Sequence, residues 1–532
     1  MLTAAMALTA AMALTAAALA SLSALEPVKP APPVPPAAPI PEAWQAEMPA
    51  AASASNAFGL DVYRALAAGS KDANLFVSPY SLSVALAMAA EGARDETYDQ
   101  MASVLHLPDA AGDQRGIARV HGGYAALSEH FRTAAGVADE ATRAKIKSLR
   151  AELEKTNKEV DRLTESKEWQ KGQAAANRAR VIAAELNGIL KTVDRFDLRV
   201  ANALWVEKTF PIVPSFVETI ARYYGTGGTG GMTPVDFKHD AERVRTRINA
   251  WVEEHTENRI KDLIPRGGVD DLTRLVITNA VYFRGEWTNP FEESRTKDVD
   301  FTSALGAKSK VPMMNDPWRG NAGYAAFNAD GSVFATPREV PADAAEAAKV
   351  QTYPDAGGFT MLELPYKGDT MSMLLILPRD PAGLSAVESQ LTGANLEQWT
   401  KSLDRRSVDT AMPRFKMEWS GEMSGVLRGL GMERAFVVPG RKGAAQFPGI
   451  SDSTDPQQQV YIGAVIHKSW VEVNEKGTEA AAATAIVMPT AAKMQAPKMI
   501  PFTPRFHAEH AFIFLIRDMK TGVVVFVGRK AA

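Results

Sequence analysis

The spacing of apolar residues predicts helices in the first part of the folded chain. Between residues 55 and 107 apolar positions recur every three or four residues, which indicates amphipathic helices. Inside this region residues 74–79 (Asn-Leu-Phe-Val-Ser-Pro) predict a short strand and then a helix that starts at the Ser-Pro step. Two more helices are expected at 215–224 and 240–255.

Long apolar runs predict strands in the rest of the chain. They lie at 198–205, 275–283, 362–366, 372–377, 460–473, 512–516 and 523–527. These runs do not alternate regularly with helices, so we expect an α+β protein with large antiparallel or mixed sheets.

Two segments differ from this pattern and predict insertions. Within an insertion at about 133–180, apolar residues follow a heptad spacing from Ile146 to Leu163, and the other positions are mostly charged. We expect a projecting coiled-coil helical hairpin over about 143–185 that turns near 164–170. Its polar exterior favours a solvated insertion over a partner-binding arm. Residues 315–351 are rich in Ala, Asp, Gly and Pro and predict a surface loop.

The first residues predict a targeting segment and a linker. Residues 1–25 carry no charged side chain, and Ala18 and Ala20 suit a signal-peptidase cut after Ala20. An uncleaved membrane anchor is the alternative, because the stretch is long enough to span a bilayer. Residues 26–54 are expected to form a linker, since eight of the fifteen residues 27–41 are proline. We therefore expect a secreted, periplasmic or extracellular protein whose folded domain covers residues 55–532.

Composition narrows the class of protein. The chain has 532 residues, with 59 basic and 62 acidic side chains and a net charge of −3. This balance excludes a dedicated nucleic-acid-binding protein, which would carry a basic surface. The absence of cysteine excludes disulfides, thiolate metal sites and cysteine nucleophiles.

Motifs for enzymatic chemistry fail on their context. Residues 225–230 (Gly-Thr-Gly-Gly-Thr-Gly) match a dinucleotide fingerprint, but they follow a helical segment and Pro234 prevents a helix after them. His507 and His510 are three residues apart without a completing ligand cluster, so structural roles are expected. We therefore predict no enzyme activity, no cofactor and no metal.

The run from Glu475 to Ile486 is unusual. A strand that ends at Val473 leads to Gly477, and the next eight residues are Ala, Thr or a single Glu. Small side chains are what a segment needs if it must slide into a crowded sheet, although an Ala-rich surface loop fits equally well. With a strand period of two, residues 478, 480, 482 and 484 share one face and the only charge lies on the other.

This run resembles the reactive-loop hinge of inhibitory serpins. Blocks at 74–107, 202–210, 276–291, 362–378, 467–484 and 512–529 also resemble serpin blocks in the family's order. The resemblance implies a serpin fold, with three β-sheets, about nine helices and an exposed reactive-centre loop, to which this chain adds the helical hairpin. The hinge would consist of Glu475, Gly477, Thr478, Glu479, Ala480, Ala481, Ala482, Ala483 and Thr484.

The resemblance also implies the remaining site residues. Ser78, Ser81, Asn279 and His467 match the family's shutter cluster, and Trp205 matches the tryptophan buried at the top of the main sheet, where insertion starts. Family spacing places the scissile bond at Ala491–Ala492. The stretch from Ala492 to Phe506 is longer than usual, so Lys493–Met494 is the alternative.

The implied function is irreversible, suicide-substrate inhibition of a serine or papain-like cysteine protease. The target would be elastase-, subtilisin- or trypsin-like and would be trapped as a covalent acyl complex by a monomeric inhibitor without catalytic residues of its own. The alternative is a non-inhibitory serpin-fold binding, carrier or chaperone protein. Proline or bulky side chains in the hinge would favour that alternative, and neither occurs between Gly477 and Thr484.

Overall fold

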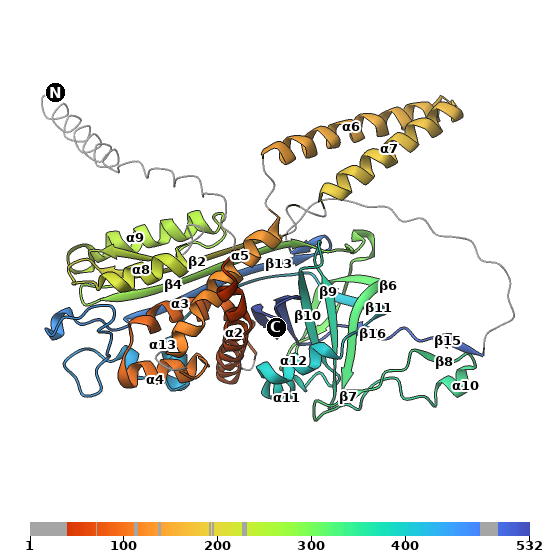
Figure 1. Ribbon diagram of the computed structural model, residues 1–532. Helices are drawn as coiled ribbons and strands as arrows, with labels where there is room; N and C mark the ends of the chain where they lie inside the picture. The colour runs from red at the N-terminus through yellow and green to blue at the C-terminus, as the bar shows by residue number, and fades with distance from the viewer. Residues whose placement is uncertain are drawn as a thin grey trace, which may run out of the picture. The chain divides into compact units, whose positions relative to one another are not determined.

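A computed structural model describes residues 40–532 except 71, 111–114, 137–139, 167, 191–192, 194–195, 226–230 and 479–497 (Figure 1). These residues form three β-sheets and twelve α-helices. Nine helices remain once the hairpin pair, α6 and α7, and the one-turn helix α10 are set aside, which agrees with the α+β class and the helix number that the sequence predicts. The expected leader and most of the proline-rich linker lie outside the described residues.

The first described helix starts earlier than we expected. Helix α2 spans Glu42–Gly69, whereas the sequence predicts a folded body from Ser55. The helix packs closely on α5 (His121–Ala135), where a Cβ atom on Gly123 would lie 2.5 Å from the carbonyl oxygen of Glu47. This close approach buries Ala51 and Ala52. Residues 42–54 are therefore part of the body and not of a linker.

The six-stranded sheet is the central element of the fold. Its strand order is β12-β13-β14-β4-β2-β3, and β13 also pairs in parallel with β4. The strands span Phe415–Glu422 (β12), Ala464–Asn474 (β13), Gly477–Thr478 (β14), Leu275–Glu286 (β4), Phe196–Glu207 (β2) and Met232–Val235 (β3). Helices α9 (Phe237–His255) and α3 (Pro79–Gly92) cover opposite faces (Figure 1), so the strands are apolar on both sides.

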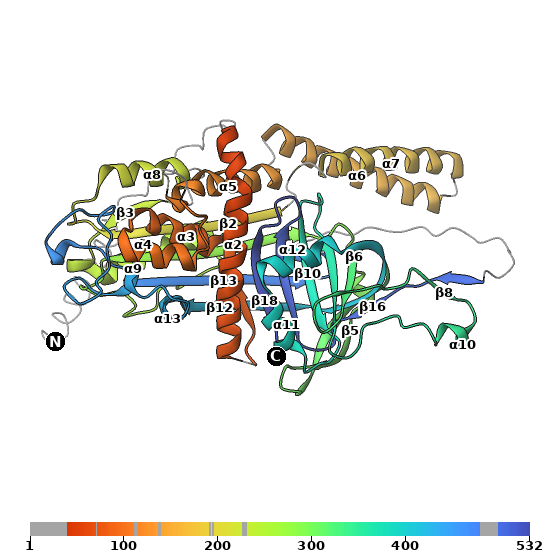
Figure 2. The same ribbon diagram turned by 60° about the horizontal axis from the view of Figure 1, so that its bottom comes forward.

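A ten-stranded sheet packs beside it (Figure 2). Its main order is β1-β18-β17-β10-β9-β6-β11-β16, and β5 and β7 pair with β6. The bounds are Leu75–Val77 (β1), Lys297–Thr302 (β5), Lys308–Phe327 (β6), Val333–Phe334 (β7), Phe359–Pro365 (β9), Met371–Pro378 (β10), Asp404–Pro413 (β11), Arg505–His507 (β16), Phe512–Asp518 (β17) and Val524–Lys530 (β18). The third sheet holds only β8 (Glu339–Pro341) and β15 (Met499–Pro501).

The predicted loop at 315–351 is partly wrong. Strand β6 continues through Phe327 and pairs with β9 and β11, and Tyr324 and Phe327 are buried in different core clusters. Small residues such as Gly323 allow this pairing, because a Cβ atom there would lie 3.1 Å from the Cβ atom of Glu363. The irregular part of the insertion therefore begins after Phe327, and it carries β7, β8 and helix α10 (Ala344–Ala347).

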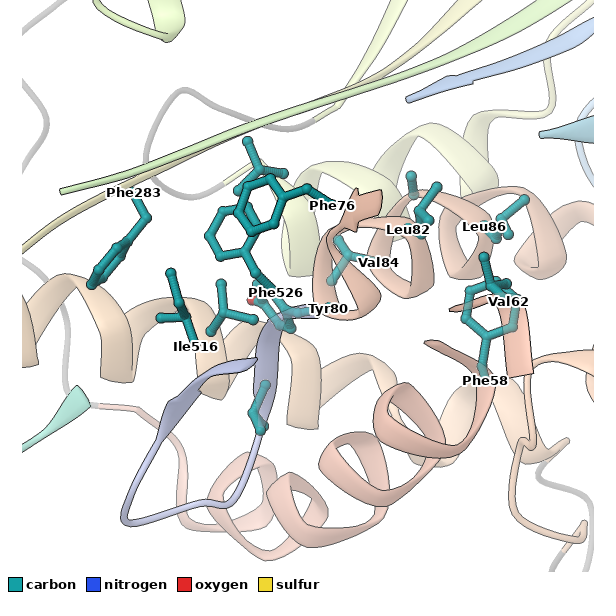
Figure 3. Close-up of a cluster of buried hydrophobic side chains, with 14 of the residues drawn as sticks. Phe58, Val62, Phe76, Tyr80, Leu82, Val84, Leu86, Phe283, Ile516 and Phe526 are labelled. Atoms are coloured by element: carbon teal, nitrogen blue, oxygen red, sulfur yellow. The ribbon is translucent and has the colours of Figure 1, made fainter. Parts of the chain in front are cut away.

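Aromatic side chains join the two large sheets to α3 (Figure 3). Phe76 of β1 stacks on Phe526 of β18 with ring centroids 4.7 Å apart, and Phe283 of β4 lies 6.4 Å from Phe526. The helix that follows β1 starts at the Ser-Pro step, as predicted. The Ser78 side chain caps it by accepting a hydrogen bond from the backbone N–H of Ser81.

The inserted segment forms the predicted hairpin of two helices, α6 (Glu140–Glu165) and α7 (Trp169–Leu190). It has a small apolar core of its own, made of Ile146, Leu149, Ile182 and Leu186. The other helices are α4 (Asp95–Val104), α8 (Pro214–Tyr224), α11 (Leu384–Gln390), α12 (Gly393–Lys401) and α13 (Ser424–Gly429). Among the helices of the described ranges, none is both long and apolar enough to cross a membrane.

Candidate functional site

A buried polar cluster lies where α3 meets the centre of the six-stranded sheet. Asn202, Asn279 and His467 are register neighbours on β2, β4 and β13, and Ser78 and Ser81 come from the start of α3. All five residues are at most 2% exposed. The structure thus brings together the four residues that the sequence predicts for the shutter, and it adds Asn202.

Each member of the cluster has hydrogen-bond partners. The Asn279 side-chain amide donates to Ser81 Oγ at 2.5 Å and to Asn202 Oδ1 at 2.6 Å, and Ser81 Oγ donates to Asn202 Oδ1 at 2.7 Å. These hydrogen bonds make the polar groups tolerable in the core, because a buried polar group without a partner lowers the stability of the fold by about 1–3 kcal/mol. The cluster therefore joins β4 to the neighbouring strand β2 and to helix α3.

The geometry of His467 defines its protonation. Its Nε2 accepts the backbone N–H of Ser78 at 3.1 Å, so the ring proton lies on Nδ1, which contacts Asn279 Oδ1. Burial lowers the pKa of His467 to about 3, and the ring is neutral at pH 7. The neutral ring bridges β13 to β4 and to the start of α3.

Two residues of this region escaped the sequence analysis. Asn202 is one of the few polar residues in the apolar run of β2, and that isolation was the available signal. Ser469, two residues after His467, donates its hydroxyl to the carbonyl oxygen of Phe76. The register of β2 on β4 decides the first contact, and the packing of β13 on β1 decides the second. The linear sequence contains neither.

Two residues of the predicted hinge form a short strand between β13 and β4. Gly477 pairs with Glu286 of β4, and Thr478 pairs with Gly285 of β4 and with Val473 of β13. Gly477 has φ of +151°, a conformation that L side chains rarely adopt. Gly477 and Thr478, the second and third of the predicted hinge residues, therefore already form a strand, β14.

Contacts with residues 474–476 fix the turn between β13 and β14. The buried Glu475 carboxylate accepts a hydrogen bond from Thr296 Oγ1 at 2.7 Å and lies 3.6 Å from Arg414 Nη1. The Trp287 indole N–H donates to the Asn474 carbonyl at 3.0 Å, and the Trp287 backbone N–H donates to the Lys476 carbonyl at 2.9 Å. The chain thus leaves β13 through an anchored turn.

The prediction for Trp205 is wrong in its location. We expected Trp205 at the end of the sheet where insertion starts, but it pairs with Val276, ten positions along β4 from the hinge contact at Glu286. There it packs edge-on against Trp251 and donates its indole N–H to Thr278 Oγ1 at 2.9 Å. Trp287 is the tryptophan beside the hinge. Trp205 lies in β2 and Trp287 directly follows β4. Only the register of these strands shows which of the two lies beside the hinge.

Comparison with known proteins decides the family. The chain matches the family described as "Serpin (serine protease inhibitor)" over residues 53–531. The chain is a serpin. It is 32% identical over 486 residues to Serpin B6 of Pongo abelii, which covers 91% of this chain and 99% of the relative. It is 30% identical over 483 residues to human leukocyte elastase inhibitor, with 90% and 98% covered.

Solved structures agree on the fold. Human thyroxine-binding globulin, solved in complex with its hormone, superposes with a TM-score of 0.62 at 19% identity and covers 91% of this serpin and 99% of its own chain. At that identity the likeness concerns architecture alone.

The rest of the expected site lies outside the described residues. This applies to the hinge residues Glu479, Ala480, Ala481, Ala482, Ala483 and Thr484, and to the two candidate bonds at Ala491–Ala492 and Lys493–Met494. Within the part of the serpin that the structure does describe, no group of three or more His, Cys, Asp or Glu side chains could hold a metal ion.

Proposed function

We propose that this serpin is an irreversible, suicide-substrate inhibitor of serine proteases. The observation that carries the proposal is β14, since Gly477 and Thr478 already occupy the first positions between β13 and β4. The residues that follow, from Ala480 to Ala483, have side chains small enough to continue into the sheet. A segment of this kind is suited to strand insertion.

The proposed reaction uses the nucleophile of the target. The protease serine attacks the Ala491 carbonyl, the Ala491–Ala492 bond breaks, and Ala491 is left as an acyl ester on the protease. The freed chain from Thr478 then extends β14 into a full strand. Fourteen residues in extended conformation span about 46 Å, so the attached protease travels along the whole sheet. Insertion must be faster than hydrolysis of the ester for trapping to succeed.

The polar cluster lies in the path of this insertion. β13 and β4 pair directly from Ala464 to Trp470, and these strands must separate before a new strand can fill the gap. The His467–Asn279 contact crosses the same boundary. We propose that the cluster acts as the shutter, which keeps the sheet closed until cleavage frees the loop.

The residues at the scissile bond support a target class. Alanine at 491 and 492 suits proteases with shallow pockets, such as elastase- or subtilisin-like enzymes. Lys493 would instead suit a trypsin-like enzyme. The uncharged leader supports a proposal that the protein meets its target outside the cytoplasm, and sequencing of the mature N-terminus would test that proposal.

Incubation with pancreatic elastase, subtilisin and trypsin tests the function. A denaturing gel should show a covalent complex with at least one protease. Mass spectrometry should show that the released peptide begins at Ala492. Protease with a chemically blocked serine is the control and should give no complex. Cleavage without a complex for all three proteases would support the non-inhibitory alternative, a serpin-fold binding, carrier or chaperone protein. Release at Met494 would move the bond to Lys493.

A further inference from the structure

Two segments that lie outside the usual family pattern pair with each other. One is the insertion after β6, and the other is the long stretch between the proposed scissile bond and Phe506. In the structure β8 and β15 form an antiparallel two-stranded sheet, with Ile500 opposite Val340. We call residues 338–342 and 498–502 the flanking ribbon. Figures 1 and 2 both show its two strands together, outside the ten-stranded sheet.

The flanking ribbon is firmly attached. Ala342 N–H donates to the Lys498 carbonyl at 3.0 Å, and Phe502 N–H donates to the Arg338 carbonyl at 2.8 Å. From β11, the Arg406 guanidinium donates to the carbonyl oxygens of Pro337 at 2.9 Å and of Phe502 at 2.7 Å. The ribbon is therefore joined at its base to the ten-stranded sheet.

Large apolar side chains face solvent on the ribbon. Met499 is 44% exposed and Ile500 is 40% exposed. Within the described ranges β8 and β15 pair only with each other, so their outer edges are open as well. Because successive side chains of a strand point to opposite faces, Met499 shares its face with Pro501 and with the opposite Pro341, and not with Ile500. An exposed apolar face is typical of contact surfaces for another protein.

The length of chain puts this surface within reach of a bound protease. Met499 is seven positions after Ala492, and seven extended residues span at most about 25 Å. A compact protease domain of about 200 residues has a radius of gyration of about 16 Å, and its diameter is therefore about 40 Å. A protease seated on the bond would therefore lie within about 25 Å of the ribbon, which is less than its own diameter.

We propose that the flanking ribbon is a second contact surface for the target protease. The face that carries Met499, Pro501 and Pro341 would pack on an apolar patch beside the protease's active-site cleft. This contact would raise the rate of attack on the loop and select among proteases that accept the same scissile bond. The inference rests on the proposed function for the identity of the partner.

The test compares Met499→Ser/Ile500→Ser with wild type, using pancreatic elastase, subtilisin and trypsin. The measured quantity is the second-order rate constant for loss of the intact chain, which counts complex and cleaved product together. For the protease that attacks wild type fastest, we expect about a tenfold decrease. Val438→Ser is the matched control, because Val438 is 45% exposed in another part of the surface, and its rate should stay within twofold.

Two further measurements keep the result unambiguous. Ile500→Leu retains an apolar side chain, so the protease should attack this variant at the wild-type rate. Equal unfolding midpoints should show that all variants fold. Rates that are equal for wild type and the double variant with all three proteases would overturn the inference. The fraction that ends as covalent complex reports on the proposed function separately, since attack is measured whether or not the protease is trapped.

Discussion

A Cβ atom built on Gly477 would lie 2.2 Å from the carbonyl oxygen of Gly285 and 2.6 Å from the Cα atom of Glu286. The hinge therefore enters the sheet at a point where β4 leaves no room for a side chain. Both atoms belong to backbone that is already paired, so they cannot move aside cheaply. Glycine at this position allows β14 to form before any cleavage.

Gly477→Ala should push β14 out of the sheet. The close approach and the φ of +151° both oppose a side chain, so we expect faster amide hydrogen exchange at Thr478 and a larger share of cleaved, untrapped product. Gly231→Ala is the matched control, because Gly231 has φ of +139° with no atom within 4 Å. Gly231→Ala should leave exchange at Thr478 unchanged, and unchanged exchange in Gly477→Ala as well would show that β4 has room for a side chain.

Thr478→Arg should convert the inhibitor into a substrate. If the loop inserts as proposed, strand alternation would turn the side chain of residue 478 toward the core, and burying an unpaired charge there costs several kcal/mol. Each 1.4 kcal/mol added to the insertion barrier slows insertion about tenfold, so the ester is hydrolysed first. Denaturing gels should show cleaved chain without complex. Glu479→Arg, on the opposite face, should still trap protease, and an undiminished complex with Thr478→Arg would disprove insertion at this hinge.

His467 should make the stability of the protein depend on pH. Its pKa is lowered by burial from 6.5 to about 3, so between these pH values the unfolded chain binds the extra proton. The free energy of unfolding should therefore fall as pH decreases through this window, by at most about 1.4 kcal/mol per pH unit. Stability is highest above pH 6.5, where both states are neutral.

His467→Gln removes this titration and should give a shallower loss of stability between pH 7 and pH 5. At pH 7 the variant should be less stable by about 1–3 kcal/mol, since the fit between Ser78 and Asn279 is disturbed. Urea unfolding at both pH values measures the two effects. Equal pH slopes for variant and wild type would show that another group causes the acid sensitivity.

The hairpin of α6 and α7 should be dispensable for inhibition. Its apolar core is separate from the other clusters, and ion pairs such as Lys145–Glu185, at 2.7 Å, join its own helices. Replacing residues 140–190 with a short Gly/Ser linker should leave the rate of complex formation within a few-fold, as measured by gel densitometry. A large loss of rate with an unchanged unfolding midpoint would instead show that the hairpin recruits the protease.

The sequence predicted elements whose signal is local. The apolar runs of β4 and β17 and the helical spacing of α8 and α9 appear close to their expected bounds. The Ser-Pro step correctly marked the start of α3, because capping by Ser78 needs only neighbouring residues. The four residues proposed for the shutter were identified because the family blocks that carry them stand in recognisable order, and the structure brings them together in one buried cluster.

Errors arose where a contact between distant segments decides the structure. Composition suggested a linker up to residue 54, but packing on Gly123 makes the end of that segment helical. Ala- and Gly-rich residues suggested a loop at 315–327, but pairing with β9 and β11 makes them a strand. The choice between Trp205 and Trp287 depended on strand register, which no local pattern contains.

The sequence by itself determined the serpin family, the strands and helices of the body, and the run of small residues after Gly477. The family follows from the resemblance of several blocks that stand in the family's order. The helices, the strands and the run of small residues follow from periodicity, turn chemistry and side-chain size, which neighbouring residues define. Only the tertiary structure decided that β14 has entered between β13 and β4, that Asn202 completes the polar cluster, and that β8 pairs with β15. Each of these depends on hydrogen bonds between segments far apart in the chain, whose pairing is set by the packing of the whole domain.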